Sequence, residues 1–205
     1  VQLFRFELTD DQTKILNIIN TEELSIKYPN INTFNADNSY ITPGFIDLQL
    51  NGCGGVLFNK SITKETLEMM HETNLKYGCT SFTPTLITTP DVNIIKALDL
   101  IDSLENKEEI GVLGLHIEGP FISLEKKGVH NPNFIRKIDE NILNRICQTG
   151  SEGVKIITIA PENIDGEYIS KLSNSGIKVA LGHTNATYEE IVDKKIYGIT
   201  LATHL

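Results

Sequence analysis

The sequence contains little cysteine and no cysteine pattern. Its three cysteines, Cys53, Cys79 and Cys147, leave one thiol unpaired in any disulfide scheme, and none forms a Cys-x-x-Cys pair. A disulfide framework is therefore excluded, and a reducing compartment with buried thiols is favoured. We expect a cytoplasmic protein in which Cys53 is a small spacer in a glycine-rich loop and the other two cysteines are packing residues.

Basic residues and long apolar runs are also scarce. The chain has 18 lysines and arginines against 27 aspartates and glutamates, a formal net charge of −9. Nucleic-acid binding needs clustered basic side chains, so no nucleic-acid partner is expected, whereas one small phosphorylated substrate is compatible with this charge. The longest apolar runs, such as residues 111–117, have the length of a strand, and the N-terminus lacks a secretion signal. No membrane association is expected.

What the sequence does contain is a regular alternation of two patterns. Hydrophobic residues make up 40% of its 205 residues, which is enough for one sizeable core. Six short apolar runs alternate with helical patterns, which predicts a parallel sheet covered by helices. An open doubly wound sheet and a closed barrel both fit this alternation. The predicted strands are residues 44–50, 79–86, 110–118, 153–160, 177–183 and 198–203.

The predicted helices begin at residues that favour helix starts. Thr63, Asp139 and Thr187 are suitable N-caps, and Pro90 is suited to a first helical position. A shorter helix is predicted near residues 167–174. The buried faces are expected to carry Leu67 and Met70, then Val92, Ile95 and Leu98, and then Ile142, Ile146 and Cys147.

The two ends of the chain differ from its middle. Residues 1 to about 40 carry short apolar stretches with polar residues between them, which predicts short strands of a small β unit. The chain begins without methionine and stops directly after the sixth predicted strand, which would leave an unpaired sheet edge. We therefore interpret it as part of a longer protein.

Polar residues stand at the carboxyl ends of the predicted strands, where ligands bind in parallel sheets. Glu118, His183 and His204 end three of these strands. One carboxylate and two imidazoles are the ligand set of a catalytic zinc that leaves a position open for water. Each residue alone also has a structural interpretation, as a hydrogen-bonded histidine or as a glutamate that caps the next helix.

Two loops and one histidine on a predicted helix are further candidates for the functional site. Residues 51–55 (NGCGG) form a loop that either approaches a ligand closely or is a plain tight turn. His130 lies in the loop after the Glu118 strand, and we interpret it either as a substrate contact or as a solvent-exposed loop residue. His71, on a predicted helix among polar neighbours, is expected to be solvated.

Several segments are similar to a known family. They read PGFID at 43–47, QLNGCGG at 49–55, GLHIEGPF at 114–121, KGVHNPNFIR at 127–136 and GHTNAT at 182–187. From residue 43 onward the chain resembles the N-acetylglucosamine-6-phosphate deacetylases of the amidohydrolase superfamily. The resemblance implies a TIM-like (β/α)8 barrel of the metal-dependent hydrolase type, truncated here after about six strands. Residues 1–42 would then be part of a small β domain, and residues 43–205 an incomplete barrel that carries the metal site.

The resemblance also implies an activity and its residues. Members of the family remove acetate from N-acetylglucosamine 6-phosphate, giving glucosamine 6-phosphate in amino-sugar catabolism, with zinc or another divalent metal. Their metal ligands correspond to Glu118, His183 and His204. Their substrate contacts correspond to Val129, through its backbone, and to His130, which would approach the acetamido carbonyl or the sugar. In the first case His130 would add a hydrogen bond to the oxyanion.

Many amidohydrolases bind two metals through a His-x-His motif at the end of the first barrel strand. Gln49 and Asn51 stand at that place here, and neither amide is a strong zinc ligand, so one divalent metal, zinc, is expected. Asp47 in the same motif is expected to be structural. The family's acid–base aspartate comes from a later strand, beyond Leu205, so the resemblance implies that this chain alone is inactive.

The resemblance leaves the partners and two alternatives open. The expected small-molecule partner is a phosphorylated amino sugar, and the full-length protein is expected to be a homo-oligomer. One alternative is an inactive barrel fragment that binds metal or a protein partner through its open edge. The other is a deacetylase of N-acetylgalactosamine 6-phosphate or of another N-acyl amine.

Overall fold

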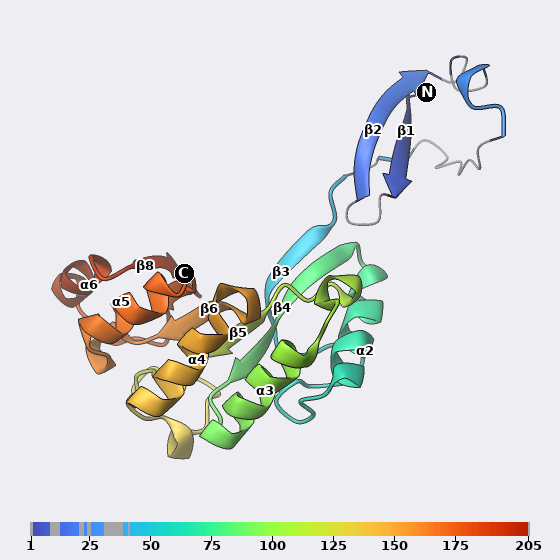
Figure 1. Cartoon of the computed structure of the whole chain (residues 1–205). Helices are drawn as coiled ribbons and strands as arrows, with labels where there is room; N and C mark the ends of the chain where they lie inside the picture. The colour runs from blue at the N-terminus through green and yellow to red at the C-terminus, as the bar shows by residue number, and fades with distance from the viewer. Residues whose placement is uncertain are drawn as a thin grey trace. The chain divides into compact units, whose positions relative to one another are not determined.

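A computed structural model describes residues 2–8, 13–20, 23, 26–30, 39–40 and 42–204. The chain divides into two compact units, residues 1–42 and 43–205. In the first unit, β1 (Gln2–Leu8) pairs antiparallel with β2 (Thr13–Asn20), and the register shifts between Arg5 and Phe6 (Figure 1). These two strands match the short strands expected there, and their membership of a small β domain stays a prediction.

The second unit contains one parallel sheet of six strands in sequence order. They are β3 (Phe45–Leu50), β4 (Cys79–Ile87), β5 (Leu115–Glu118), β6 (Val154–Ile159), β7 (Lys178–Leu181) and β8 (Ile199–Ala202). All six predicted strands are found, but the third begins later than expected. Gly111 and Gly114 have φ of +64° and +136°, which interrupts extended backbone, and only an isolated bridge between Phe82 and Val112 precedes β5.

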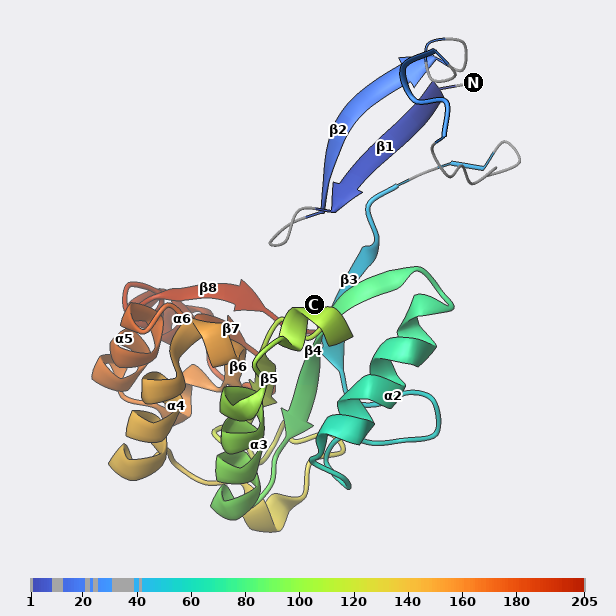
Figure 2. The same cartoon turned by 45° about the vertical axis from the view of Figure 1, so that its right-hand side comes forward.

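Helices alternate with these strands, and each packs on the strand that follows it. Figures 1 and 2 show α2, α3, α4 and α5 along the same face of the sheet. The α-helices are α2 (Lys64–Leu75), α3 (Asp91–Ser103), α4 (Glu140–Gly153), α5 (Gly166–Asn174) and α6 (Tyr188–Lys195). The 3-10 turns are η1 (Lys107–Ile110), η2 (Pro132–Phe134) and η3 (Pro161–Asn163).

Thr63, Asp139 and Thr187 are the N-caps of α2, α4 and α6, as predicted, and each side chain accepts hydrogen bonds from the first turn. Thr187 and Glu190 form a reciprocal capping box. The prediction for Pro90 is off by one position: it is the N-cap of α3, with extended backbone at φ −60° and ψ 154°.

The buried helix faces agree with the prediction in α2 and α4 and only in part in α3. Leu98 is buried as predicted, but Val92 and Ile95 are 69% and 41% exposed, and Ile94 and Ile101 are buried instead. Three residues are less than one 3.6-residue turn, so a row of residues spaced by three winds away from the buried face. Ile94, Leu98 and Ile101 are spaced by four and then by three, and this alternation keeps them on the side of the helix that faces the core.

The core lies between the helices and the sheet. Its strand residues include Phe82, Ile117, Ile157 and Val179, all at most 1% exposed. The three cysteines are free and half-buried. Within the described residues, no helix is both long and apolar enough to cross a membrane.

Candidate functional site

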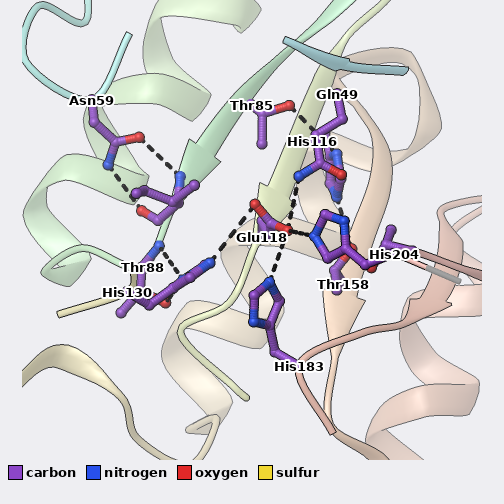
Figure 3. A network of polar contacts seen from close by, with 12 residues as sticks. Gln49, Asn59, Thr85, Thr88, His116, Glu118, His130, Thr158, His183 and His204 are labelled. Carbon is purple, nitrogen blue, oxygen red and sulfur yellow. Dashed lines mark hydrogen bonds and ion pairs between the residues drawn. The ribbon is translucent and has the colours of Figure 1, made fainter. Parts of the chain in front are cut away.

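Glu118 is the centre of a group of histidines at the carboxyl ends of the strands (Figure 3). It ends β5, and its Oε1 atom lies 3.2 Å from Nε2 of His183 and 2.8 Å from Nε2 of His204, which follow β7 and β8. The structure thus brings together the three residues that were predicted as metal ligands. Together with His130, we call them the carboxylate–histidine cluster.

His183 and His204 have an unusual backbone. Their φ angles of 50° and 59° make them the two non-glycine residues with positive φ in the described part of the chain. Side chains with a Cβ rarely adopt this region, and such backbone persists where the surrounding structure enforces it, often at functional sites. The two strand ends therefore turn sharply at the residues that face Glu118.

Two hydrogen bonds join His183 to the loop that follows β5. Its Nδ1 lies 2.8 Å from the carbonyl oxygen of Lys126, and its own carbonyl accepts a 2.8 Å hydrogen bond from the backbone N–H of Ser123. A carbonyl only accepts, so Nδ1 carries a proton, and in the neutral ring, which is the metal-binding form, Nε2 then presents a lone pair. This lone pair faces Glu118 Oε1, and a cation shared by two such acceptors relieves their repulsion. The donor set therefore suits a metal ion.

Burial and the surrounding histidines act in opposite directions on Glu118, which is 2% exposed. Burial raises its pKa, but the hydrogen bond with His204 and the nearby imidazoles of His130, His116 and His183 lower it by more. The net result is a pKa below the usual value for glutamate. A charged carboxylate is the form that binds a cation.

His130 is buried, so its interpretation as a solvent-exposed loop residue is wrong. It is 2% exposed, and its Nε2 lies 3.8 Å from Glu118 Oε2. The ligand-type atoms of Glu118, His130 and His183 all lie within 4.8 Å of one another. Burial, then the neighbouring imidazole of His183, lowers the pKa of His130 to about 4 against the opposing effect of Glu118, so its ring is neutral at pH 7.

Of the other residues singled out in the sequence, Gln49 contacts the carboxylate–histidine cluster directly, and the rest lie around it. Gln49 Nε2 donates a 2.9 Å hydrogen bond to Glu118 Oε1, and Asp47 accepts from the backbone of Gln49 at 2.9 Å, a structural role. Asn51 contributes its backbone carbonyl, which accepts from the N–H of Phe58. Val129 is 89% exposed, in the same loop as His130.

Three polar residues near the cluster were not predicted as site residues. His116, two positions before Glu118, is 1% exposed; its Nδ1 lies 3.1 Å from the carbonyl of Leu48, and burial lowers its pKa. Thr88 contacts His130, and Glu162 holds the turn after His183. Thr88 directly follows β4, and Glu162 lies in η3 just after β6, so the same strand-end criterion, applied to every strand, would have found them.

His71 was expected to be solvated, and this prediction is wrong. It is half-buried, and its Nδ1 is buried without a hydrogen-bond partner among the described residues. The turn η1 packs against α2, and Gly111, directly after this turn, lies close to the His71 ring.

A parallel β/α sheet with a carboxylate and several histidines at its strand ends is the arrangement of barrel hydrolases that use a metal. Residues 40–205 match the sequence model of the amidohydrolase family, and the chain belongs to this family. Family membership implies a divalent metal, for which the carboxylate–histidine cluster is a candidate site. The prediction that six parallel strands form part of a (β/α) barrel of this type is confirmed.

The chain is similar to named deacetylases. It is 50% identical over 175 residues to an N-acetylglucosamine-6-phosphate deacetylase of Haemophilus influenzae, covering 85% of this chain and 46% of that protein. It is 37% identical over 166 residues to an N-acetylgalactosamine-6-phosphate deacetylase of Shewanella sp., covering 80% and 42%.

Solved structures give the same result. The structure of an N-acetylglucosamine-6-phosphate deacetylase from Pasteurella multocida is 42% identical, with a TM-score of 0.85, over 94% of this chain and 50% of that chain. A Mycobacterium smegmatis variant in complex with N-acetyl-D-glucosamine-6-phosphate is 31% identical with a TM-score of 0.72, over 80% and 42%. The chain therefore spans about half the length of the relatives it matches.

Proposed function

We propose that the protein is a metal-dependent amide hydrolase that removes acetate from N-acetylglucosamine 6-phosphate to give glucosamine 6-phosphate. The observation that carries this proposal is the convergence of His183 and His204 on one oxygen of the buried Glu118. The 50% identity to a relative with this name supports the choice of substrate.

The proposed ligands of one zinc ion are Glu118, His183 and His204. A divalent cation held there supplies Lewis acidity, which activates water and polarises a carbonyl group. Gln49 supports a single-metal site, because its amide nitrogen donates to Glu118 and an amide is a poor zinc ligand.

The proposed substrate contacts come from the loop after β5. His130 faces Glu118 from the side opposite to Gln49, contacting Oε2 where Gln49 contacts Oε1. A neutral imidazole in this buried place donates a hydrogen bond to the carbonyl oxygen of the acetamido group and stabilises the charge that develops there. Val129, whose side chain is exposed, would contact the sugar through its backbone.

The proposal for the whole protein also includes an acid–base aspartate outside residues 1–205, because an amine leaves poorly unless it is protonated. On this proposal residues 1–205 alone do not turn over substrate, and the full-length enzyme is a cytoplasmic homo-oligomer. Equal specific activity of residues 1–205 expressed alone and of the protein as its gene encodes it would contradict the first point. Sedimentation velocity of the protein as its gene encodes it tests whether the full-length enzyme is a homo-oligomer.

The decisive experiment is an assay of acetate release from N-acetylglucosamine 6-phosphate by the protein as its gene encodes it. We expect turnover that a chelator abolishes and zinc restores, and a loss of at least about 10²-fold in His183→Ala. His71→Asn is the matched control, since His71 lies on α2 outside the cluster. Turnover that is insensitive to the chelator would refute the metal mechanism.

N-acetylgalactosamine 6-phosphate should be tested as a second substrate in the same assay, because one 37% identical relative is named for its deacetylation. The ratio of kcat/KM for the two epimers decides between them. Zinc binding by Glu118 and its histidines without turnover of either sugar would instead support the non-catalytic alternative.

A further inference from the structure

The backbone N–H and the hydroxyl group of Thr88 both contact the same nitrogen atom of His130. The backbone N–H of Thr88 donates to Nδ1 at 3.4 Å, and the hydroxyl oxygen of Thr88 lies 2.6 Å from the same Nδ1 (Figure 3). Thr88 is 5% exposed and His130 is 2% exposed, so water does not compete for these contacts. The pairing joins the end of β4 to the loop after β5 across 42 positions of sequence.

This geometry selects one protonation pattern of the ring. A backbone N–H can only donate, so the Nδ1 atom that it meets must present a lone pair. The Thr88 hydroxyl then donates to the same lone pair, whereas a proton on Nδ1 would point at the N–H of Thr88. A neutral imidazole carries its one proton on the other nitrogen. His130 therefore carries its proton on Nε2, the atom on the Glu118 side.

The surroundings leave little freedom for another arrangement. Gly119 has φ of +73°, and a Cβ at this position would lie 2.4 Å from the Thr88 hydroxyl, so the close approach needs glycine. Six residues beyond His130, Arg136 donates a 3.2 Å hydrogen bond to the carbonyl of Thr89 and also pairs with Asp91. The loop is thus fastened to the end of β4 at two adjacent residues.

We propose that Thr88 is a positioning residue that holds His130 in the Nε2–H tautomer, so that His130 donates a hydrogen bond to the substrate's carbonyl oxygen and does not bind the metal. This role rests on the proposed amide hydrolase function. It also separates the histidines of the cluster by chemistry: His183 presents a lone pair on Nε2, whereas His130 presents a proton. The third ligand position is left to His204, 2.8 Å from Glu118.

The first test observes the tautomer directly. The protein as its gene encodes it is labelled with ¹⁵N-histidine, loaded with zinc, and studied by long-range ¹H–¹⁵N NMR, with His130→Gln used to assign the resonance. We expect the Nε2–H pattern in the wild type and in Thr88→Ser, which keeps the hydroxyl. Thr88→Val removes the 2.6 Å hydroxyl contact and leaves only the longer 3.4 Å contact with the backbone N–H, so the share of the Nδ1–H tautomer should rise. An Nδ1–H or zinc-bound pattern in the wild type would overturn the proposal.

The second test asks whether the tautomer matters for turnover. Thr88→Val should lower kcat by about 10- to 100-fold, somewhat less than deletion of an oxyanion donor, with KM and zinc content close to wild type. Thr89→Val is the matched control, because Thr89 is equally buried but its hydroxyl bonds Asn93. A shifted tautomer with unchanged kcat, or a reduced kcat with an unshifted tautomer, would each contradict the role of Thr88.

The two proposals fail in different ways. Absence of acetate release in the wild type counts against the proposed function, while the NMR result still decides the tautomer. Conversely, an active wild-type enzyme with His130 in the Nδ1–H form retains the function and removes Thr88 from its mechanism. If Thr88→Val does not fold, Thr88→Ala, which also lacks the hydroxyl, takes its place in both tests.

Discussion

The hydroxyl of Thr184 donates a 2.5 Å hydrogen bond to one carboxylate oxygen of Glu162. The other oxygen accepts from the backbone N–H of Asn185 at 2.7 Å. Through these two hydrogen bonds Glu162 stabilises the turn directly after His183. The positive φ of His183, 50°, is a strained conformation that persists only with such support. His183 in turn places its Nε2 3.2 Å from Glu118 Oε1.

Glu162→Ala should therefore weaken metal binding. Loss of a group that orients a metal ligand typically costs about 10- to 100-fold in affinity, and we expect a loss in that range. Zinc affinity is measured by competition with a chromophoric chelator. Glu162→Gln keeps an acceptor oxygen and should lose less, and Glu152→Ala, with an 85% exposed side chain, should lose nothing. Wild-type affinity in Glu162→Ala would contradict the role of Glu162.

Acid should destabilise the fold partly through His130. Its pKa is about 4 in the folded protein and near 6.5 when unfolded, so between these values the unfolded chain binds a proton that the folded chain does not. The stability it contributes is complete above pH 6.5 and is lost as the pH falls toward 4. From pH 7 to pH 5, His130→Gln should lose about 1–2 kcal/mol less of unfolding free energy than the wild type.

Urea denaturation in the presence of chelator measures this difference. His71→Gln is the control, because the prediction is specific to the buried ring of the cluster. Parallel pH dependences for the wild type and His130→Gln would contradict the shifted pKa.

The N-cap of α4 offers a test of local stability. Asp139 accepts hydrogen bonds from the backbone N–H groups of Asn141 at 2.8 Å and Ile142 at 3.1 Å. Asp139→Ala leaves both donors without this partner and should cost about 1 kcal/mol of unfolding free energy. Asp139→Asn retains an acceptor and should remain close to wild type in the same urea titration. Equal midpoints for Asp139→Ala and the wild type would refute the assignment.

Cys53 should be a slow nucleophile. Burial raises the pKa of its thiol, and the negative charge of Asp47 and the neighbouring Cys79 thiol raise it further. Iodoacetamide reacts with the thiolate, so at pH 8 Cys53 should be alkylated more slowly in the folded protein than in urea. Asp47→Asn removes one of these causes and should accelerate the reaction. Peptide mass spectrometry measures both rates, and equal rates in folded and unfolded protein would contradict the raised pKa.

Local chemistry made much of the fold predictable. Thr63, Asp139 and Thr187 mark helix starts because an N-cap depends on residues two or three positions away. The buried face of α3 was partly missed, since it depends on how the helix rotates against neighbouring elements. The choice between an open sheet and a barrel could not be made from periodicity alone, because both place apolar strands between helices.

The candidate site was predictable by residue type and not by contact. Glu118, His183 and His204 could be singled out because parallel strands present their carboxyl ends at one edge. Thr88 and Glu162 were missed even though they also come just after strand ends, because only some of these ends were considered. Whether His130 was exposed or buried could not be decided from its loop sequence.

The sequence by itself determined the order of strands and helices, the helix caps and the polar residues at the strand ends, since these follow from neighbours along the chain. Only the tertiary structure decided that His183 and His204 meet on the same oxygen of Glu118. Only it decided which nitrogen of His130 carries the proton, because that depends on Thr88, 42 positions away in sequence but 2.6 Å away in space. Distances of this kind arise from packing, and pattern along the chain does not contain them.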